Sequence, residues 1–484
     1  MKSIRYLAVF CPTMAALGCG ASPDTSESTA ETQSAIIDGS VGLIATGTLS
    51  GALSDHSRET ADPLENGVAG NLLGGIGSGL AYAGGNTFLA LPDRGPNALS
   101  YNGDVDDTVS YVNRFQTVDL KLKKARSASA LPFELSPKLL DTTLLYSKEP
   151  LVYGTGTDAG LPDGASALNR KRRFYFTGRS DNFDPTELST NQHDARFDPE
   201  SVRVSNDGNR VYISDEYGPY IYEFDRETGR RLRSFTLPSD FAVSTLSAQG
   251  SVEIADNTEG RVANKGMEGL ALTPDGNTLV GAMQSPLLQD GGTNGRFTRI
   301  VVLSLESGAT FQYAYELTNI GTDKKPKYPT ISDILAIDDH EFLVDERDGK
   351  GLGDDSTAVF KRIYQIDLSG ATEVSGVTGD VNLAGLAVGK SLFLDVVAAL
   401  NAQGIDSNNI PSKLEGLAFG PDVMLGSAKQ HTLFVANDND FTGTVVDTTH
   451  PDGIDNPNVF FVFGVPADTL PDYIPQQFTD GCYD

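Results

Sequence analysis

Residues 268–282 read EGLALTPDGNTLVGA, and they contain the unit from which most of the chain is built. An apolar strand of five residues opens this stretch, and a second apolar strand closes it. Between the two strands, Pro274-Asp275-Gly276 has the residue types of a tight turn. Two short strands joined by such a turn predict an antiparallel hairpin.

The same unit recurs along the chain. Similar first strands open at Ser78, Glu200, Asp333 and Glu415, and each is followed by a second and a third apolar strand. Antiparallel strands repeated in one fixed order are typical of β-propeller blades. The predicted second strands are residues 87–91, 211–214, 279–282, 341–344 and 432–436, and the predicted third strands are 111–120, 220–224, 299–305, 362–368 and 459–465.

The spacing of the openings predicts the number of blades. Counted from residue 78, the successive gaps are 122, 68, 65 and 82 residues. Because the first gap is nearly twice the next two, we expect a degenerate blade between residues 120 and 190. The chain is therefore predicted to be all-β, a single β-propeller of six blades, with a seventh left open. Residues 36–49 are placed to close the ring against the C-terminal strand, which would remove exposed sheet edges.

The N-terminal residues precede the repeats. Lys2 and Arg5 lead into an apolar run over residues 6–17 that is too short to span a bilayer and is typical of a signal peptide. The run ends at Cys19 in a sequence that resembles a bacterial lipobox, so Cys19 is predicted to carry lipid; ordinary cleavage of a secretory signal is the alternative. The expected organisation is a signal peptide over residues 1–19, a flexible tether over 20–35 and the propeller over 36–484.

The charge balance is strongly acidic. The 484 residues include 65 Asp and Glu against 37 Lys and Arg, a net charge of -28. Such a surface repels nucleic acid and favours cations, above all calcium, which prefers carboxylate oxygens; solubility of an exported protein is the alternative explanation. We expect a monomer that binds no nucleic acid and meets a membrane only through its lipid anchor. The expected location is the bacterial outer membrane or periplasm, or outside the cell.

Acidic residues occupy the same point of successive units. Glu200, Glu268, Asp333 and Glu415 open their first strands, and equivalent positions of a propeller form a ring. We therefore expect these side chains to converge at the central channel or at one of its mouths. Converging carboxylates must be neutralised by cations, arginines or protonation. Either the ring holds Ca²⁺, or each acid caps a neighbouring blade by accepting backbone N–H groups.

Polar residues also follow the second strands. Asp93, Asp215, Asp345 and Asp438 stand at these ends, where loops on a rigid scaffold commonly carry a site. Formation of Asx turns is the alternative. The arginines that lie in or resemble these strand ends are the predicted partners of the acids: Arg94, Arg179 and Arg347.

Several segments resemble those of one known family. They are DPES (198–201), ISDEYGP (213–219), NKGMEGLA (264–271), KLEGLA (413–418), DRGPN (93–97) and DERD (345–348). In this order they resemble the bacterial family named for the esterase-like activity of phytase, over about residues 70–465. The resemblance implies an extracytoplasmic propeller with phosphoester or ester hydrolase activity. Ser201 and Asp333 depart from the family's usual Glu-Gly pattern, so the ring of acids is not expected to be fully equivalent.

The sequence therefore predicts a calcium-assisted hydrolase of anionic small molecules such as phosphate esters. The alternatives are a lactonase-like propeller, in which one metal polarises a carbonyl group, and a non-catalytic surface binding or scaffold protein. The predicted metal ligands are Glu200, Asp215, Glu268, Asp345 and Glu415; the substrate-binding residues are Arg94, Arg347 and Arg179; the catalytic residues are Glu268, Glu415 and Arg347.

Overall fold

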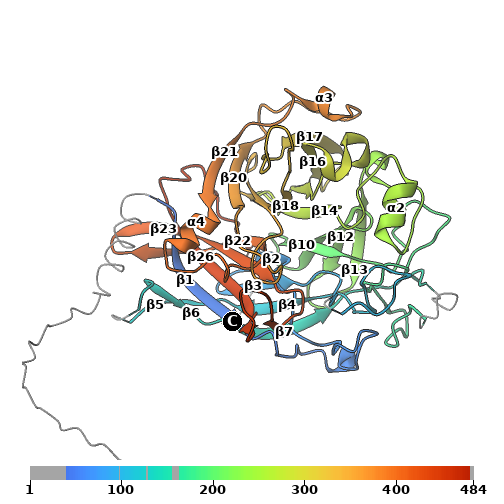
Figure 1. The fold of residues 1–484 in the computed structure, drawn as a ribbon, viewed down its shortest axis with the longest axis horizontal. Helices are drawn as coiled ribbons and strands as arrows, with labels where there is room; N and C mark the ends of the chain where they lie inside the picture. The colour runs from blue at the N-terminus through green and yellow to red at the C-terminus, as the bar shows by residue number, and fades with distance from the viewer. Residues whose placement is uncertain (1–39, 98, 127–128, 155–162, 480–484) are drawn as a thin grey trace, which may run out of the picture.

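The computed structural model describes residues 40–97, 99–126, 129–154 and 163–479, and in these residues the protein is a β-propeller (Figure 1). Five four-stranded antiparallel sheets form the blades. From the innermost strand outward they are β2 (Gly79–Tyr82), β3 (Thr87–Leu91), β4 (Arg114–Asp119) and β7 (Lys138–Leu144); β10 (Pro199–Val204), β11 (Arg210–Asp215), β12 (Tyr220–Asp225) and β13 (Arg231–Thr236); β14 (Met267–Leu272), β15 (Thr278–Met283), β16 (Phe297–Ser304) and β17 (Thr310–Glu316); β18 (Thr330–Ala336), β19 (Glu341–Arg347), β20 (Lys361–Asp367) and β21 (Lys390–Asp395); β22 (Lys413–Leu425), β23 (Ala428–Asp438), β26 (Asn458–Pro466) and β1 (Gly42–Leu49).

Short elements connect the blades. Three pairs of short strands and three helices lie outside the five sheets, together with single 3-10 turns. They are β5 (Leu122–Lys124) with β6 (Phe133–Leu135), β8 (Tyr146–Ser147) with β9 (Phe174–Tyr175), β24 (Thr444–Val445) with β25 (Ile454–Asp455), α2 (Gly250–Asp256), α3 (Asp380–Leu383) and α4 (Val396–Asn401), and the 3-10 turns η1 (Arg58–Thr60), η3 (Ser239–Phe241), η4 (Leu288–Asp290) and η5 (Gly292–Asn294). No helix in the described part of the chain is long and apolar enough to cross a membrane.

The first strands pack side by side around the channel. β2 contacts β10, β10 contacts β14, β14 contacts β18, β18 contacts β22, and β22 contacts β2 again. β10 and β14 are buried along their whole lengths, as expected for strands covered on both faces by neighbouring blades. Apolar side chains between adjacent sheets form the core, and between the first two blades Phe176 and Phe197 stack against Tyr222.

The prediction of six blades is corrected by this arrangement. Within the described residues, the ring of first strands closes with five members. The described residues between 120 and 190 supply β7 as the fourth strand of the first blade and otherwise only strands of two or three residues. A long insertion, rather than an extra blade, therefore accounts for the wide first gap in the repeat.

The prediction that an N-terminal strand closes the ring is confirmed. β1 pairs antiparallel with β26, from Gly42 opposite Gly464 to Leu49 opposite Asn458. The fourth strand of the last blade thus comes from the other end of the chain, and the two ends of the domain are joined through one sheet.

Candidate functional site

A β-bulge at the start of the first strands positions the repeated acids. The register between the first and second strands shifts at Glu200, Glu268 and Glu415, so these residues have no direct partner on the second strand. An unpaired bulge residue commonly re-aims its side chain, and here three glutamates from three blades are turned toward one mouth of the channel. In the fourth blade the bulge residue is Ser332, and Asp333 comes one position later.

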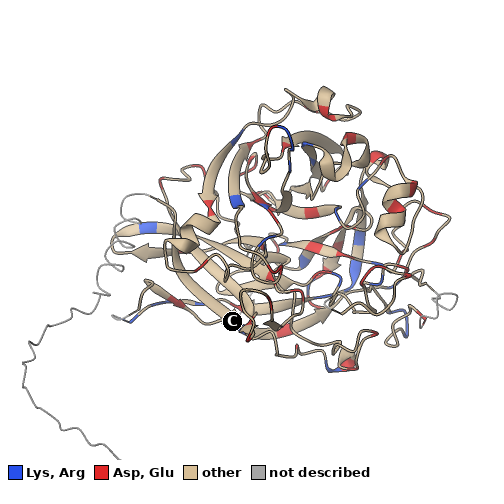
Figure 2. Ribbon diagram, viewed as in Figure 1, with Lys and Arg blue, Asp and Glu red and all other residues tan. Residues whose placement is uncertain are grey.

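The three glutamates line a polar cavity of about 400 Å³. Figure 2 shows acidic and basic residues close together near the centre of the ring. Acids outnumber bases in the lining, so the cavity carries an excess of negative charge when all groups are ionised. The carboxyl groups are Asp93, Glu200, Glu216, Glu268, Glu415, Asp438 and Asp440, and the basic groups are Arg94, Lys265, Arg347 and Lys413.

The ends of the second strands supply a further ring of polar groups. Asp438 pairs with Lys413, Arg347 pairs with Thr330, and the N–H of Glu216 donates to the carbonyl of Asp198. These pairings place Asp438, Arg347 and Glu216 at the same point of their blades, where each lines the cavity.

Two predicted metal ligands lie behind the cavity wall. Asp215 precedes Glu216, is fully buried, and its Oδ1 accepts the backbone N–H of Asp198 at 2.9 Å. Asp345 stands opposite Asp333 in the fourth blade. Neither side chain contributes to the cavity lining. Asp215 is the strand neighbour of Glu216 and points to the opposite face of the sheet, whereas Asp345 lies two residues before Arg347 and is buried within the blade.

Three carboxyl groups converge at one side of the cavity. One oxygen atom from each of Asp198, Glu200 and Glu216 lies within 4.8 Å of the others. Burial and repulsion from Asp198 raise the pKa of Glu216 to about 7, and burial and repulsion from Glu268 raise the pKa of Glu200 well above its usual range. Glu216 Oε1 is buried and accepts no hydrogen bond from the described residues, although a hydrogen bond between the carboxyl groups of Glu268 and Glu216 partly offsets the rise in the pKa of Glu216. An unpartnered oxygen among three buried carboxyl groups fits the preference of a hard divalent cation for carboxylate ligands.

Basic groups gather at the other side. Arg347 forms an ion pair with Glu415, and its Nε donates to Ser332 Oγ at 2.7 Å. Lys413 Nζ contacts Asp438 Oδ2 at 2.7 Å and Asp440 Oδ1 at 2.5 Å. These contacts fix two cations at the rim of the cavity.

Lys265 is bonded differently from the other lining cations. Its Nζ donates to Gln284 Oε1 at 2.7 Å, and no described carboxylate pairs with it. Burial lowers the pKa of Lys265. Gln284 in turn donates to Glu268 Oε2 at 2.7 Å, while Glu268 Oε1 is 4.0 Å from Arg347 Nη2. Glu268 therefore lies between the carboxyl cluster and the basic side.

The predicted arginines divide between two environments. Arg94 lines the cavity and binds Asp198 Oδ2 through Nη1 at 3.0 Å, so it is tied to the carboxyl cluster. Arg179 is fully buried elsewhere, where its Nε contacts Asp181 Oδ1 at 2.6 Å and its Nη1 approaches Glu65 at 3.5 Å. Of the described residues predicted to bind substrate, the cavity thus brings together Arg94 and Arg347. Cys19, predicted to carry lipid, lies outside the described residues.

Asp333 matches the blade-capping interpretation of the repeated acids. Its Oδ2 accepts the backbone N–H of Leu417 at 2.9 Å, and both of its oxygens accept from Arg203 Nη2 at 2.9 Å. Asp333 thereby ties the second, fourth and fifth blades together across the channel. Leu417 lies only two residues beyond Glu415, so the Asp333–Arg203 pair marks the inner end of the polar cavity.

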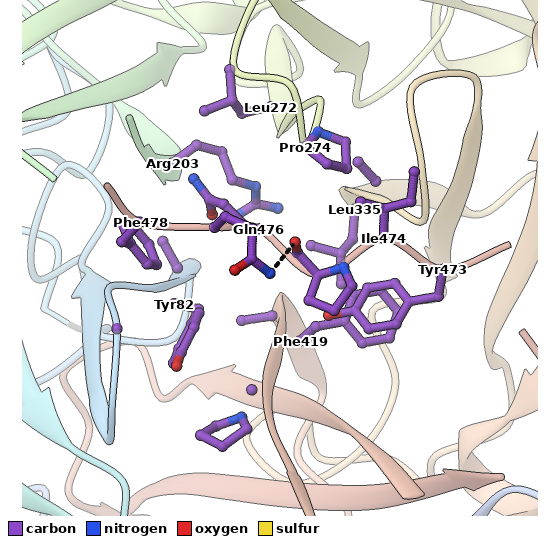
Figure 3. Close-up of a pocket in the computed structure, with 18 of the residues that line it drawn as sticks. Tyr82, Arg203, Leu272, Pro274, Leu335, Phe419, Tyr473, Ile474, Gln476 and Phe478 are labelled. Carbon is purple, nitrogen blue, oxygen red and sulfur yellow. Dashed lines mark hydrogen bonds between the residues drawn. The ribbon is translucent and has the colours of Figure 1, made fainter. Parts of the chain in front are cut away.

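A second cavity of about 360 Å³ occupies the opposite mouth (Figure 3). Arg203 lies at its inner end, and the chain from Tyr473 to Phe478 crosses the mouth. Tyr473 lies against Phe419 at a tilt of 41° with ring centroids 4.3 Å apart, and Phe478 meets Tyr82 edge-on at 5.7 Å. This mouth is lined mainly by apolar and aromatic groups and lacks the converging acids of the polar cavity.

Sequence reasoning missed Asp198, Glu216, Lys265, Lys413 and Asp440. Glu216 directly follows the predicted Asp215, so this signal was assigned one residue off, and Asp198 lies two residues before the predicted Glu200. The turn between β10 and β11 is one residue longer than the turn between β2 and β3. The position equivalent to Asp93 therefore falls on Glu216, although Asp215 has the same spacing from its strand opening as Asp93.

Residues 71–441 match the phytase-like family described as "Esterase-like activity of phytase". An "uncharacterized secreted protein" of Arthroderma benhamiae is 30% identical over 321 residues, which cover 58% of this chain and 60% of that protein. This chain therefore spans less than two thirds of the length of that curated relative.

Two bacterial enzymes are among the solved structures that resemble the chain. The periplasmic gluconolactonase of Pseudomonas aeruginosa is 12% identical, with 88% of this chain and 99% of that chain covered and a TM-score of 0.33. A putative 6-phosphogluconolactonase from Bacteroides uniformis is also 12% identical, with 87% and 98% covered and a TM-score of 0.30.

Proposed function

Because this chain belongs to the phytase-like family, we propose that it is an exported, calcium-assisted hydrolase of small phosphate esters that acts in the polar cavity. The observation that carries the proposal is the convergence of Asp198 with Glu200 and Glu216, two glutamates that line the same cavity as Arg347 and Lys413. A hydrolase of phosphate esters needs both a place for a cation and fixed positive charge for the phosphoryl oxygens. The secreted relative supports export.

Asp198, Glu200 and Glu216 are the proposed calcium ligands. One oxygen atom of each residue lies within 4.8 Å of the others, and Glu216 Oε1, which accepts no hydrogen bond from the described residues, can coordinate a cation. A bound calcium ion would supply positive charge at this side of the cavity and lower the cost of holding three buried carboxylates together. Arg94 fixes Asp198 from outside the cluster through its 3.0 Å ion pair.

Arg347 and Lys265 are the proposed phosphate-binding groups. Glu415 and Ser332 hold the Arg347 guanidinium in place, and no described group accepts a hydrogen bond from its Nη1. Guanidinium groups bind phosphate oxygens through paired N–H donors. Lys265 donates one of its three N–H groups to Gln284, and the other two can donate to an oxygen atom of the substrate.

Glu268 is the proposed proton donor to the leaving oxygen. It stands between the carboxyl cluster and Arg347, and Gln284 orients its carboxyl group. Burial and repulsion from Glu216 raise its pKa well above the usual range, which favours the protonated acid. Such an acid can protonate the departing alkoxide as a water molecule bonds to phosphorus and the bond from phosphorus to the ester oxygen breaks.

The geometry favours this function over the two alternatives. A lactonase-like site would need a metal cluster but no guanidinium in the same cavity, whereas Arg347 lines it. A purely architectural role would leave the acids bonded to backbone, as Asp333 is, whereas no described group donates to Glu216 Oε1.

The test is phosphate release from p-nitrophenyl phosphate and from phytate by the full chain, with calcium and with a chelator. We expect calcium-dependent release, and a fall in kcat of roughly 100-fold or more in Glu268→Gln, the usual effect of losing a general acid. The matched control is Glu341→Gln, which makes the same change away from the cavity. Absence of release from both esters, or equal rates in the two variants, would refute the proposal.

A further inference from the structure

Basic residues from two distant parts of the chain gather at the outer edge of the second blade. Lys148, Arg230, Arg231 and Arg233 border a groove of about 360 Å³ on the outer strand β13. Their side chains are exposed or partly exposed, and Glu149 is the acid among the groove residues. We call this surface the β13 groove. It is distinct from both mouths of the channel.

A basic hairpin extends the β13 groove. Residues 170–173 read RKRR and are all exposed. Arg173 lies over the ring of Tyr146 at 5.0 Å, and Arg172 pairs with Glu149 at 3.4 Å. Among the described residues, none of the other basic groups of the groove and hairpin forms an ion pair within 4.0 Å, although Glu223 stands opposite Arg233 on the neighbouring strand and the chain as a whole carries a net charge of -28. The hairpin therefore neutralises the one groove acid and leaves the surface positive.

The hairpin tip holds its two cations in an unusual backbone conformation. Lys171 and Arg172 have φ angles of 50° and 63°, and Arg170 and Arg173 exchange backbone hydrogen bonds across them. Such a turn favours Asn and Gly, because a larger side chain pays a steric cost in the left-handed region. Basic residues occupy both positions in spite of this steric strain, which indicates that their positive charge has a function at the tip of the hairpin.

The guanidinium at the floor of the groove is fixed before any ligand arrives. Arg231 lies over the Tyr222 ring at 4.7 Å and the Phe176 ring at 5.2 Å. It also donates to the carbonyl of Gln192 at 2.5 Å and to Ser147 Oγ at 3.3 Å. A cation held in this way loses little conformational freedom when it binds an anion.

We propose that the β13 groove binds a compact, multiply charged anion, a small molecule that carries several phosphate or sulfate groups. The patch gathers positive charge locally, whereas the surrounding protein is strongly acidic. Beyond about 8 Å, the Debye length in physiological salt, a ligand no longer interacts strongly with the patch. A compact anion gains the attraction of the groove, while an extended polymer or a bilayer would also meet the acidic surface.

The test is calorimetric titration of the full chain with myo-inositol hexasulfate, which a phosphatase cannot consume, and with inorganic tripolyphosphate. The test variant is Lys171→Gln/Arg172→Gln/Arg233→Gln. The control Lys324→Gln/Lys325→Gln/Lys327→Gln removes the same charge from another exposed segment. We expect a binding event that weakens at least tenfold in the test variant and less than twofold in the control, while any binding of the same anion in the polar cavity is equal in both variants, with both melting temperatures preserved.

The outcomes separate the proposal from its rivals. Arginines on an outer strand can also serve to block pairing between sheet edges; aggregation of the test variant with unchanged affinity would favour that role and overturn the site. Equal weakening in both triple variants would attribute binding to net charge. Binding to phosphatidylglycerol vesicles without binding to the small anions would replace the ligand by a membrane. Glu268→Gln, which probes the polar cavity, is expected to bind hexasulfate like the wild type, and loss of binding in that variant would place the ligand in the cavity.

Discussion

Asp333 and Glu216 are both buried carboxyl groups, yet the fold surrounds them differently. Asp333 receives hydrogen bonds from Arg203, Leu417 and the hydroxyl of Ser201, so its charge is compensated within the protein. Glu216 keeps an oxygen without a partner among the described residues, beside two further acids. Uncompensated carboxyl groups cost stability, and they persist where a ligand or a reaction uses them.

Asp194 gives a test of this cost away from the cavity. Burial raises its pKa from 3.8 to about 7, and the nearby Arg196 compensates only in part. The folded protein therefore binds this proton more tightly than the unfolded chain does, and the resulting stability is lost as the pH rises from about 4 to 7. The substitution Asp194→Asn removes the titrating carboxyl group, and with it the loss of stability on deprotonation. We expect the stability of the variant relative to the wild type to rise by roughly 2 kcal/mol between pH 4 and pH 8, measured by urea unfolding. A difference that is constant with pH, or that favours the wild type at pH 8, would contradict the assignment.

At the scale of elements, strand patterns were predictable but their registers were not. The second strand at residues 87–91 was predicted with its exact bounds, and the third strands agree with the structure to within a few residues. The bulges at Glu200, Glu268 and Glu415 leave no mark in the hydrophobic pattern. A shift of one residue reverses which side chains face the cavity, which explains why the sequence predicts Asp215 as a metal ligand although Glu216 lines the cavity.

The closing strand β1 gives a test at this scale. Ile44 is fully buried against the core of the last blade, and β1 is the only strand of that sheet from the N-terminal part of the described chain. Ile44→Ala is expected to destabilise the whole propeller by about 3 kcal/mol, since it leaves a cavity in the sheet that joins the chain ends. Thermal unfolding should stay a single transition with a lower Tm. Val446→Ala removes methyl groups from a residue that is 70% exposed and should leave Tm unchanged. An unchanged Tm in Ile44→Ala would show that ring closure by β1 contributes little.

At the scale of the whole molecule, the repeated strand units predict the propeller correctly, whereas the spacing between them predicts one blade more than the described residues form. Five openings were read from the sequence, and the structure closes the ring with these five. The extra blade was inferred from spacing alone, and spacing does not distinguish a blade from a long insertion. Five of the predicted site residues, Glu200, Glu268, Glu415, Arg94 and Arg347, lie together in one cavity, and their roles there stay a prediction. The residues that the sequence did not predict, such as Glu216 and Lys265, are far apart along the chain and lie together only because the blades surround one channel.

The most direct test of the account is calcium binding by the full chain, measured by calorimetric titration of the wild type beside Glu216→Gln. The account predicts one site in the wild type, and at least a tenfold weaker affinity in Glu216→Gln with Tm preserved, because the variant removes the oxygen that has no partner in the protein. Asp452→Asn, in an exposed acidic loop, should bind calcium as the wild type does. Equal affinities in Glu216→Gln and the wild type, or loss of binding in Asp452→Asn instead, would contradict the assignment of calcium to the polar cavity.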